Sequence, residues 1–218
     1  MAQPIFPKWL NSARLVILAV LAGGPVYAVV LLGYGASPKT LNVGYQPDQP
    51  VPFSHKLHAG DLGLDCRYCH NTVEKAYHAA VPPTATCLNC HTNIHPSSVR
   101  LAEVRKSGET GEPIPWVRVH KLPDYVYFNH AAHIQGGVSC VSCHGRVDTM
   151  EKVHQVEPLS MGWCLECHRA PENHLRPADK VFELAWKADS EEAQIALGLE
   201  LKDKHNINPS TDCSTCHR

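Results

Sequence analysis

The chain reads Cys66-Arg67-Tyr68-Cys69-His70 at its first pair of cysteines, and the pattern C-x-x-C-H of this stretch recurs four more times. In chain order we call the five stretches motif 1 (Cys66, Cys69, His70), motif 2 (Cys87, Cys90, His91), motif 3 (Cys140, Cys143, His144), motif 4 (Cys164, Cys167, His168) and motif 5 (Cys213, Cys216, His217). Together they use all ten cysteines. C-x-x-C-H is the attachment signature of c-type haem: two thiols form thioether bonds to the haem, and the adjacent histidine becomes the proximal ligand of the iron. The sequence therefore predicts five covalently attached haem c groups.

Three other kinds of cysteine site fit this pattern poorly. Structural zinc joins C-x-x-C units in pairs, so five units would leave one over, and zinc does not need a histidine directly after every second cysteine. A disulfide framework would not arrange ten cysteines as five identical pairs. A thioredoxin-type redox motif would occur once, between a strand and a helix.

The composition favours a fold whose core is made by its haems. After an apolar N-terminal block, about 180 residues of the 218 remain to surround five haems, which is too little for an ordinary apolar core. The 17 prolines and 14 glycines are typical of a loop-rich chain. We expect a multihaem cytochrome c with short α-helices around the haems and little or no β-structure. The net charge of −1 gives no basis for nucleic-acid binding.

Residues 15–34 form an uncharged run, LVILAVLAGGPVYAVVLLGY. At about 1.5 Å per residue this run makes a helix of about 30 Å, long enough to cross the apolar core of a bilayer. The apolar part of a cleaved signal peptide is normally only about 7–15 residues long. We therefore predict that residues 15–35 are an uncleaved transmembrane signal anchor, preceded by a short cytoplasmic N-terminus of residues 1–14.

Basic residues predict the orientation of this anchor. Lys8 and Arg14 precede the apolar run, and Lys39 is the only basic residue among the next 20. The positive-inside rule then places the N-terminus in the cytoplasm. We expect a single-pass protein of the cell inner membrane, with the haem domain on the periplasmic side, where c-type haem is attached.

A repeat organises the rest of the chain. Residues 51–58 (VPFSHKLH) and 126–133 (VYFNHAAH) share the pattern V-x-F-x-H-x-x-H, and each copy precedes two haem motifs. We therefore predict a linker at 36–50 and a pentahaem domain at 51–218, made of dihaem module 1 (51–95), a connector (96–125), dihaem module 2 (126–176), and a helical segment with the fifth haem (177–218). Within the domain we expect helices at 98–106, 179–188 and 190–204, the last with Ser190 as its N-cap.

The histidines of the repeat are candidates for the distal iron ligands. His55 and His58 lie three residues apart, as do His130 and His133, so each pair shares one face of a helix. Two side chains on one face cannot hold opposite sides of one haem. We therefore expect the first histidine of each pair to ligate a haem of its own module and the second to reach a neighbouring haem, which would link the haems into one array.

These four histidines leave one of the five irons without a distal ligand. His120 and Met150 are both candidates, and a methionine in place of a histidine raises the haem potential. We expect Met161, close to Cys164, to pack locally. The remaining histidines are expected at the surface or in loops: His78, His95, His154, His174 and His205.

No catalytic site is evident in the sequence. A multihaem catalyst of the nitrite-reductase type would replace one proximal histidine with lysine, whereas all five motifs end in histidine. An iron with two protein ligands has no open position for a substrate. We therefore predict an electron-transfer protein that is not itself catalytic.

Four stretches carry a family resemblance: FSHKLHAGDLGLDCRYCH, WVRVHKLPDYVYFNHAAH, EPLSMGWCLECHRAPENHLRP and the ending TDCSTCHR. They resemble the pentahaem c-type subunit of bacterial alternative complex III, and the resemblance covers most of the chain after residue 45. The module of F-x-H-x-x-H plus haem motifs is also similar to cytochromes c3 and c7. The resemblance implies that most irons have two histidine ligands and one has His/Met ligation, for which Met150 matches the position. Six candidates (His55, His58, His120, His130, His133, Met150) then compete for five sites.

The resemblance also implies partners in a respiratory-chain membrane complex. Multi-helix membrane subunits would bind and oxidise quinol, and an iron–sulfur, molybdopterin-like subunit would pass the electrons on. The acceptor would be a monohaem cytochrome c or a terminal oxidase. Two alternatives stay open: a self-contained membrane-anchored multihaem quinol dehydrogenase, which needs an open haem position, and a periplasmic electron shuttle of the cytochrome c7 type, against which the anchor argues.

Overall fold

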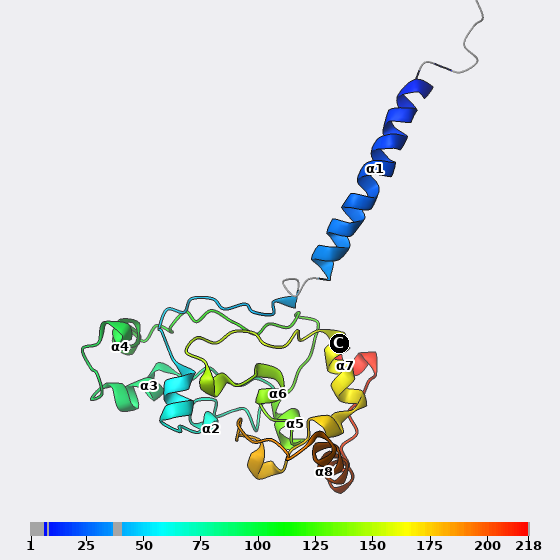
Figure 1. Cartoon of the computed structure of the whole chain (residues 1–218). Helices are drawn as coiled ribbons and strands as arrows, with labels where there is room; N and C mark the ends of the chain where they lie inside the picture. The colour runs from blue at the N-terminus through cyan, green and yellow to red at the C-terminus, as the bar shows by residue number, and fades with distance from the viewer. Residues whose placement is uncertain (1–6, 8, 37–40, 218) are drawn as a thin grey trace, which may run out of the picture. The chain divides into compact units, whose positions relative to one another are not determined.

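The computed structural model describes residue 7 and residues 9–36 and 41–217 of the chain. It divides into two compact units, Met1–Asn42 and Val43–Arg218. The first unit contains α1, Leu10–Gly35, of which Ala13–Gly35 is long and apolar enough to cross a membrane (Figure 1). The helix thus begins a few residues before the predicted span and ends at the predicted residue. Lys8 and Lys39, on which the predicted orientation partly depends, lie outside the described residues.

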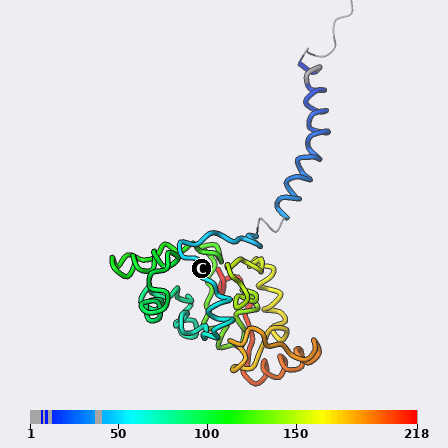
Figure 2. Tube along the Cα trace, turned by 60° about the vertical axis from the view of Figure 1, so that its left-hand side comes forward, coloured from blue at the N-terminus to red at the C-terminus, as the bar shows by residue number. Residues whose placement is uncertain are grey.

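The second unit is a chain of short helices joined by loops (Figures 1 and 2). Its α-helices are α2 (Cys66–Cys69), α3 (Thr84–His91), α4 (Ala102–Thr110), α5 (His130–Gln135), α6 (Val141–His144), α7 (Met161–Arg169), α8 (Glu191–Lys204) and α9 (Cys213–Cys216). Single turns of other helix types are η2 (Lys56–Asp61), η3 (Val99–Leu101), η4 (Val147–Thr149), η5 (Pro171–Asn173) and η6 (Ala178–Lys180). Among the described residues, β-structure is limited to two isolated bridges, Val126 with His217 and Val138 with Leu175. The predicted loop-rich helical class is confirmed.

The apolar core made by the polypeptide is small. The buried hydrophobic residues of the described chain are Val51, Val73, Val104, Ala131, Leu175, Val181, Leu184 and Leu201. A domain of this length would ordinarily bury many more apolar side chains to offset its loss of conformational entropy. The small core is the arrangement expected of a domain whose remaining interior is supplied by bound groups.

Close backbone approaches hold several of these short elements together. Gly60 of η2 lies against the carbonyl group of Asp148 in η4, and Gly198 of α8 lies against the carbonyl group of Glu172 in η5. A side chain at either glycine would collide with backbone that cannot rotate away. Gly60 therefore allows the turn that carries His58 to pack on the turn that follows motif 3.

The predicted helices of the connector and the C-terminal segment are only partly correct. The connector helix begins after Ser98, as predicted, but continues through η3 and α4 to Thr110. The helix at 190–204 is confirmed: α8 begins after Ser190, whose hydroxyl accepts a hydrogen bond from the Ala193 N–H at 3.1 Å.

The helix predicted at 179–188 is wrong. Only the single turn η6 forms there. Tertiary partners take the backbone carbonyls that a helix would use, because Ser139 donates to the Val181 carbonyl and Arg176 to the Glu183 carbonyl. Long-range hydrogen bonds and the burial of Val181 and Leu184 thus override the local helical preference.

Candidate functional site

Each haem motif begins on, or one residue before, a short helix. The cysteines of motif 1 begin and end α2, and those of motif 5 begin and end α9. Motif 2 ends α3, motif 4 lies within α7, and Cys140 of motif 3 is the N-cap of α6. Residues three apart on a helix lie on the same face, so each helix presents its two thiols side by side. None of the ten cysteines forms a disulfide bond.

Backbone carbonyls orient four of the five motif histidines. The Nδ1 atoms lie within hydrogen-bond distance of a carbonyl oxygen: His70 with Ala80 (2.7 Å), His91 with Ile94 (3.0 Å), His168 with Ser210 (2.7 Å) and His217 with Tyr125 (3.3 Å). A carbonyl can only accept, so Nδ1 must carry the proton, and Nε2 keeps its lone pair. A hydrogen bond of this kind is the usual way in which a protein prepares a histidine to bind a metal through Nε2.

The two copies of the sequence repeat have the same ring geometry. Phe53 lies edge-on to His55, with centroids 4.8 Å apart, and stacks on His58 at 4.4 Å. Phe128 repeats this arrangement, 4.7 Å from the first histidine of its copy and 4.5 Å from the second. Each phenylalanine therefore packs against both histidines of its copy. The sequence pattern includes this phenylalanine but did not indicate its role.

Nδ1 is also fixed on three of the four repeat histidines. His58 and His133 each donate to the carbonyl four residues earlier, of Ser54 (2.9 Å) and Asn129 (2.7 Å), whereas His130 donates to the distant carbonyl of Tyr77 (2.9 Å). These three side chains thus keep Nε2 free in the same way as the motif histidines.

Three repeat histidines face motif histidines across a gap that fits an iron. The ring centroids are 6.2 Å apart for His58 and His91, 6.4 Å for His130 and His144, and 6.1 Å for His133 and His168. Two metal–nitrogen bonds of about 2 Å each, with each ring centre about 1 Å behind its nitrogen, give a separation of about 6 Å. The pairs therefore have the spacing of two axial ligands of one iron, and the residues present fit haem c.

His55 lies near motif 1. Its Nδ1 is buried with no hydrogen-bond partner among the described residues. Burial, followed by the nearby charges of His70 and His58, lowers the pKa of His55 to about 4. Burial, aided by His120 and His130, lowers the pKa of His144 to about 3. Both imidazoles are thus neutral at physiological pH, which is the form that binds metal.

His120 is placed differently from the paired histidines. Its ring centroid is only 4.3 Å from that of His144, and the two rings are nearly perpendicular. That separation leaves no room for an iron between them. Nε2 of His120 is nevertheless buried, with no hydrogen-bond partner in the described part of the chain. His120 therefore lies beside His144, whereas His130 faces it at the spacing of an axial pair.

Met150 lies next to module 1, although it follows motif 3 in sequence. Its carbonyl accepts a hydrogen bond from the Lys56 N–H at 3.0 Å, so it lies beside the turn that carries His55 and His58. Met150 borders a hollow of about 470 Å³ together with His154. The ring beside His217 of motif 5 is that of Tyr125, with centroids 5.7 Å apart.

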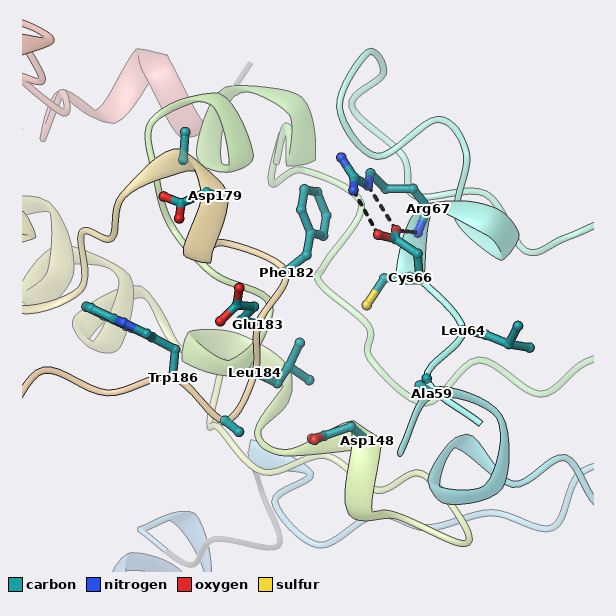
Figure 3. A pocket seen from close by; sticks show the side chains of 14 residues that line it. Ala59, Leu64, Cys66, Arg67, Asp148, Asp179, Phe182, Glu183, Leu184 and Trp186 are labelled. Atoms are coloured by element: carbon teal, nitrogen blue, oxygen red, sulfur yellow. Dashed lines mark hydrogen bonds and ion pairs between the residues drawn. The ribbon is translucent and has the colours of Figure 1, made fainter. Parts of the chain in front are cut away.

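A cavity of about 570 Å³ opens between motif 1 and the segment 178–186. Figure 3 shows the sulfur of Cys66 pointing into it, opposite Phe182 and Trp186. Arg67 borders the same cavity, where its guanidinium pairs with Asp65 at 2.8 Å and lies over the Phe182 ring at 4.4 Å. The cavity therefore combines aromatic and charged side chains beside a haem-attachment thiol.

The thiols of motif 3 are the most deeply enclosed. Burial raises the pKa of Cys140 to about 11 and that of Cys143 to about 12. The Cys164 and Cys167 thiols of motif 4 lie close enough to Cys143 to contribute to its shift. Motif 3 therefore lies inside the domain and next to motif 4.

Sequence reasoning missed the residues that orient the ligands. The Thr72 hydroxyl donates a hydrogen bond to the His78 carbonyl and accepts one from the Ala80 N–H. It thereby positions Ala80, whose carbonyl accepts the hydrogen bond from Nδ1 of His70. The Ser210 carbonyl, 42 residues away in sequence, accepts the hydrogen bond from Nδ1 of His168. Because the atoms that accept hydrogen bonds from the histidines are backbone carbonyls, no residue type in the sequence could have marked them. Among the described residues, no group of three or more His, Cys, Asp or Glu side chains converges as a structural metal site would.

Two comparisons with known proteins point to multihaem c-type cytochromes. Residues 126–218 match the family described as cytochrome c7 and related cytochrome c, whose members carry covalently bound haem. The chain is also 33% identical over 173 residues to the multiheme cytochrome c subunit of menaquinone reductase from Nitratidesulfovibrio vulgaris. That match covers 70% of this chain and 80% of the relative.

Proposed function

The chain belongs to the family of multihaem c-type cytochrome subunits that includes the menaquinone reductase subunit of N. vulgaris, and we propose that it relays electrons within a quinone-linked membrane complex. The observation that carries this proposal is the set of three imidazole pairs spaced 6.1–6.4 Å apart. An iron with two imidazole ligands exchanges single electrons but has no position open to a substrate. When bound, haem c supplies one such electron carrier at each site.

The proposal assigns most ligands from the geometry described above. Each motif holds its haem through two cysteines and its own histidine, which gives five haems. The distal ligands of motifs 2, 3 and 4 are, in that order, His58, His130 and His133. His55, which lies near His70, and Met150, beside the turn that carries His55, are alternatives for the iron of motif 1, and the family resemblance favours Met150 as the ligand of a His/Met site. His120 remains a candidate for further ligation.

The proposed surroundings follow from the anchor and the family. Residues 15–35 cross the inner membrane once with the N-terminus in the cytoplasm, and the haem domain lies on the periplasmic side. Quinol is oxidised in multi-helix membrane subunits, and electrons reach this chain through an iron–sulfur, molybdopterin-like subunit. They leave to a monohaem cytochrome c or a terminal oxidase, as in alternative complex III.

A second direction of electron flow has a specific observation in its favour. The relative from N. vulgaris is named a menaquinone reductase, so in that complex the quinone accepts electrons. The geometry of bis-imidazole sites is the same for either direction, because such a site takes up and gives away electrons equally. The direction depends on the partners and on the potentials.

The test is to purify the complex through a tag on this chain and to record the haem absorbance. Relay from quinol predicts that a menaquinol analogue reduces the haems within the complex. Relay to quinone predicts that pre-reduced haems are oxidised by a menaquinone analogue. A chain whose cysteines of motif 3 are replaced by alanine serves as the control for haem content. If neither the quinol nor the quinone changes the redox state of the haems, the proposed function is wrong.

Replacing Met150 by histidine tests the proposed His/Met site. We expect Met150→His to lower the midpoint potential of one haem and to leave the others in place, because a thioether ligand favours the reduced iron more than an imidazole does. Met161→His is the matched control, since Met161 is 64% exposed at the start of α7. The measurement is a redox titration followed by haem absorbance. An unchanged titration of Met150→His would remove this residue from the ligand set.

A further inference from the structure

We infer that the five haem-attachment sites are arranged in space in the order motif 2, motif 1, motif 3, motif 4, motif 5, which differs from their order in the sequence. This inference rests on the proposed haem-bearing function, and it concerns which sites are neighbours and which form the two ends. In chain order the first site would be an end and the second an internal site. In the order inferred here these two exchange places.

Motifs 1 and 2 are in direct contact. Asn89, between the cysteines of motif 2, donates a hydrogen bond to the hydroxyl of Tyr68, between the cysteines of motif 1, at 3.1 Å. The turn that begins after His55 also serves both sites, because His55 lies near His70 while His58 faces His91. One turn of the chain therefore spans the two sites of module 1.

Motif 1, and not motif 2, adjoins the second module. Helix α5 contacts the segment after motif 1. Its first residue, His130, donates hydrogen bonds to the Tyr77 carbonyl from its backbone N–H and from Nδ1. The ring of the same His130 faces His144 of motif 3. In a separate contact, η2, which begins directly after His55, packs on η4, which begins three residues after motif 3. Two separate contacts thus join the surroundings of motif 1 to those of motif 3.

Motifs 3, 4 and 5 follow in the order of the chain. Helix α5 carries His130 and His133 one turn apart, and these face His144 of motif 3 and His168 of motif 4. His168 in turn donates to the carbonyl of Ser210, whose hydroxyl accepts from the Asp212 N–H directly before motif 5. Each successive pair of sites therefore shares a bonded or facing element.

Cysteine exposure supports the same order independently. Only two of the ten cysteines are exposed, Cys90 in motif 2 and Cys213 in motif 5. The cysteines of the internal sites are all partly covered, and those of motif 3 are the most enclosed. Figure 1 shows α3, α2, α6 and α7 in this sequence across the domain, with the C-terminal end next to α7.

The order has a functional consequence for the duplicated modules. Along the array, the two sites of module 1 come in the reverse of their chain order, and the two sites of module 2 come in chain order. The modules therefore meet through their first sites, motif 1 and motif 3. The ends of the array are then motif 2, beside α4, and motif 5, at the C-terminus. Redox partners are expected to approach these two ends, since only there is a haem-attachment cysteine exposed.

The test compares two variants of the full-length chain in its complex, each lacking one haem. In Cys87→Ala/Cys90→Ala an end site is lost, so we expect the electron paramagnetic resonance signal of one remaining haem, that of motif 1, to change. In Cys66→Ala/Cys69→Ala an internal site is lost, so we expect two remaining signals to change, those of motifs 2 and 3. Magnetic and electrostatic coupling falls with distance, so each signal reports its neighbours.

The opposite result, with two changed signals after loss of motif 2 and one after loss of motif 1, would establish chain order and overturn the inference. Should loss of a haem prevent folding, His91→Met and His70→Met retain both thioether bonds and raise the potential of a single site. The midpoint potentials of the neighbours then shift, and the same count applies: one neighbour for His91→Met and two for His70→Met. Equal counts would also overturn the inference. Neither result depends on quinone turnover, so failure here is distinguishable from failure of the proposed function.

Discussion

His130→Ala is expected to convert one haem of the holoprotein from a low-spin to a high-spin state. The ring of His130 faces His144 at 6.4 Å, nearly parallel to it, and its Nδ1 is fixed by the Tyr77 carbonyl. If His130 is the distal ligand of motif 3, as proposed, alanine would remove that ligand and leave the iron with only one protein ligand. The measurement is the electron paramagnetic resonance and absorption spectrum of the purified complex, in which one low-spin signal should be replaced by a high-spin signal while the others remain.

Two further variants make this result specific. His130→Met should restore a low-spin signal at a higher midpoint potential, because a thioether can ligate the same iron. His95→Asn is the matched control, since His95 is exposed and has a positive φ of 52° that asparagine tolerates. We expect it to leave every haem signal unchanged.

His120 provides the decisive comparison, because its ring also contacts His144. If His120 were the distal ligand of motif 3, His120→Ala would produce the high-spin signal and His130→Ala would not. The structure predicts the reverse, since only His130 is separated from His144 by the space that an iron needs.

Gly198→Ala is expected to destabilise the domain by about 1–3 kcal/mol, the usual cost of overpacking. A Cβ at this position would lie 2.6 Å from the carbonyl carbon of Glu172 and closer still to its oxygen. That carbonyl also accepts a hydrogen bond from Gln194 at 3.1 Å, and Lys202 pairs with the Glu172 carboxylate at 3.3 Å. Helix α8 would have to move away from η5 and lose these contacts.

Thermal unfolding of the haem-loaded chain measures the effect. For a protein of this size, about 1 kcal/mol corresponds to a shift of about 2–4 °C in Tm. Gly162→Ala is the control, because Gly162 is an exposed residue of helix α7, and no neighbouring atom of the described chain lies within 4 Å of the place that a Cβ would take. Alanine there should be neutral or slightly stabilising, as expected from helix propensity. Equal Tm values for both variants would show that α8 does not depend on this close approach.

The elements that the sequence predicted correctly depend on local spacing. The five motifs could be recognised directly from residue type and spacing, whereas the short helices that carry them were found only in the structure. Ser190 caps α8 as predicted, because an N-cap bonds N–H groups of its own first turn. The helix predicted at 179–188 does not form, because Ser139 and Arg176, from elsewhere in the chain, donate hydrogen bonds to carbonyls of this segment.

The sequence by itself determined the five haem-attachment motifs and the apolar N-terminal helix, and it predicts that neighbouring repeat histidines serve different irons, since each of these is a matter of residue type at short spacing. Only the tertiary structure determined which motif each histidine faces. The carbonyls of Tyr77 and Ser210 orient His130 and His168 from 53 and 42 residues away. The hydrogen bond between Asn89 and Tyr68 makes motif 2 a direct neighbour of motif 1. Such pairings depend on how separate segments pack against one another, and the order of residues along the chain does not encode them locally.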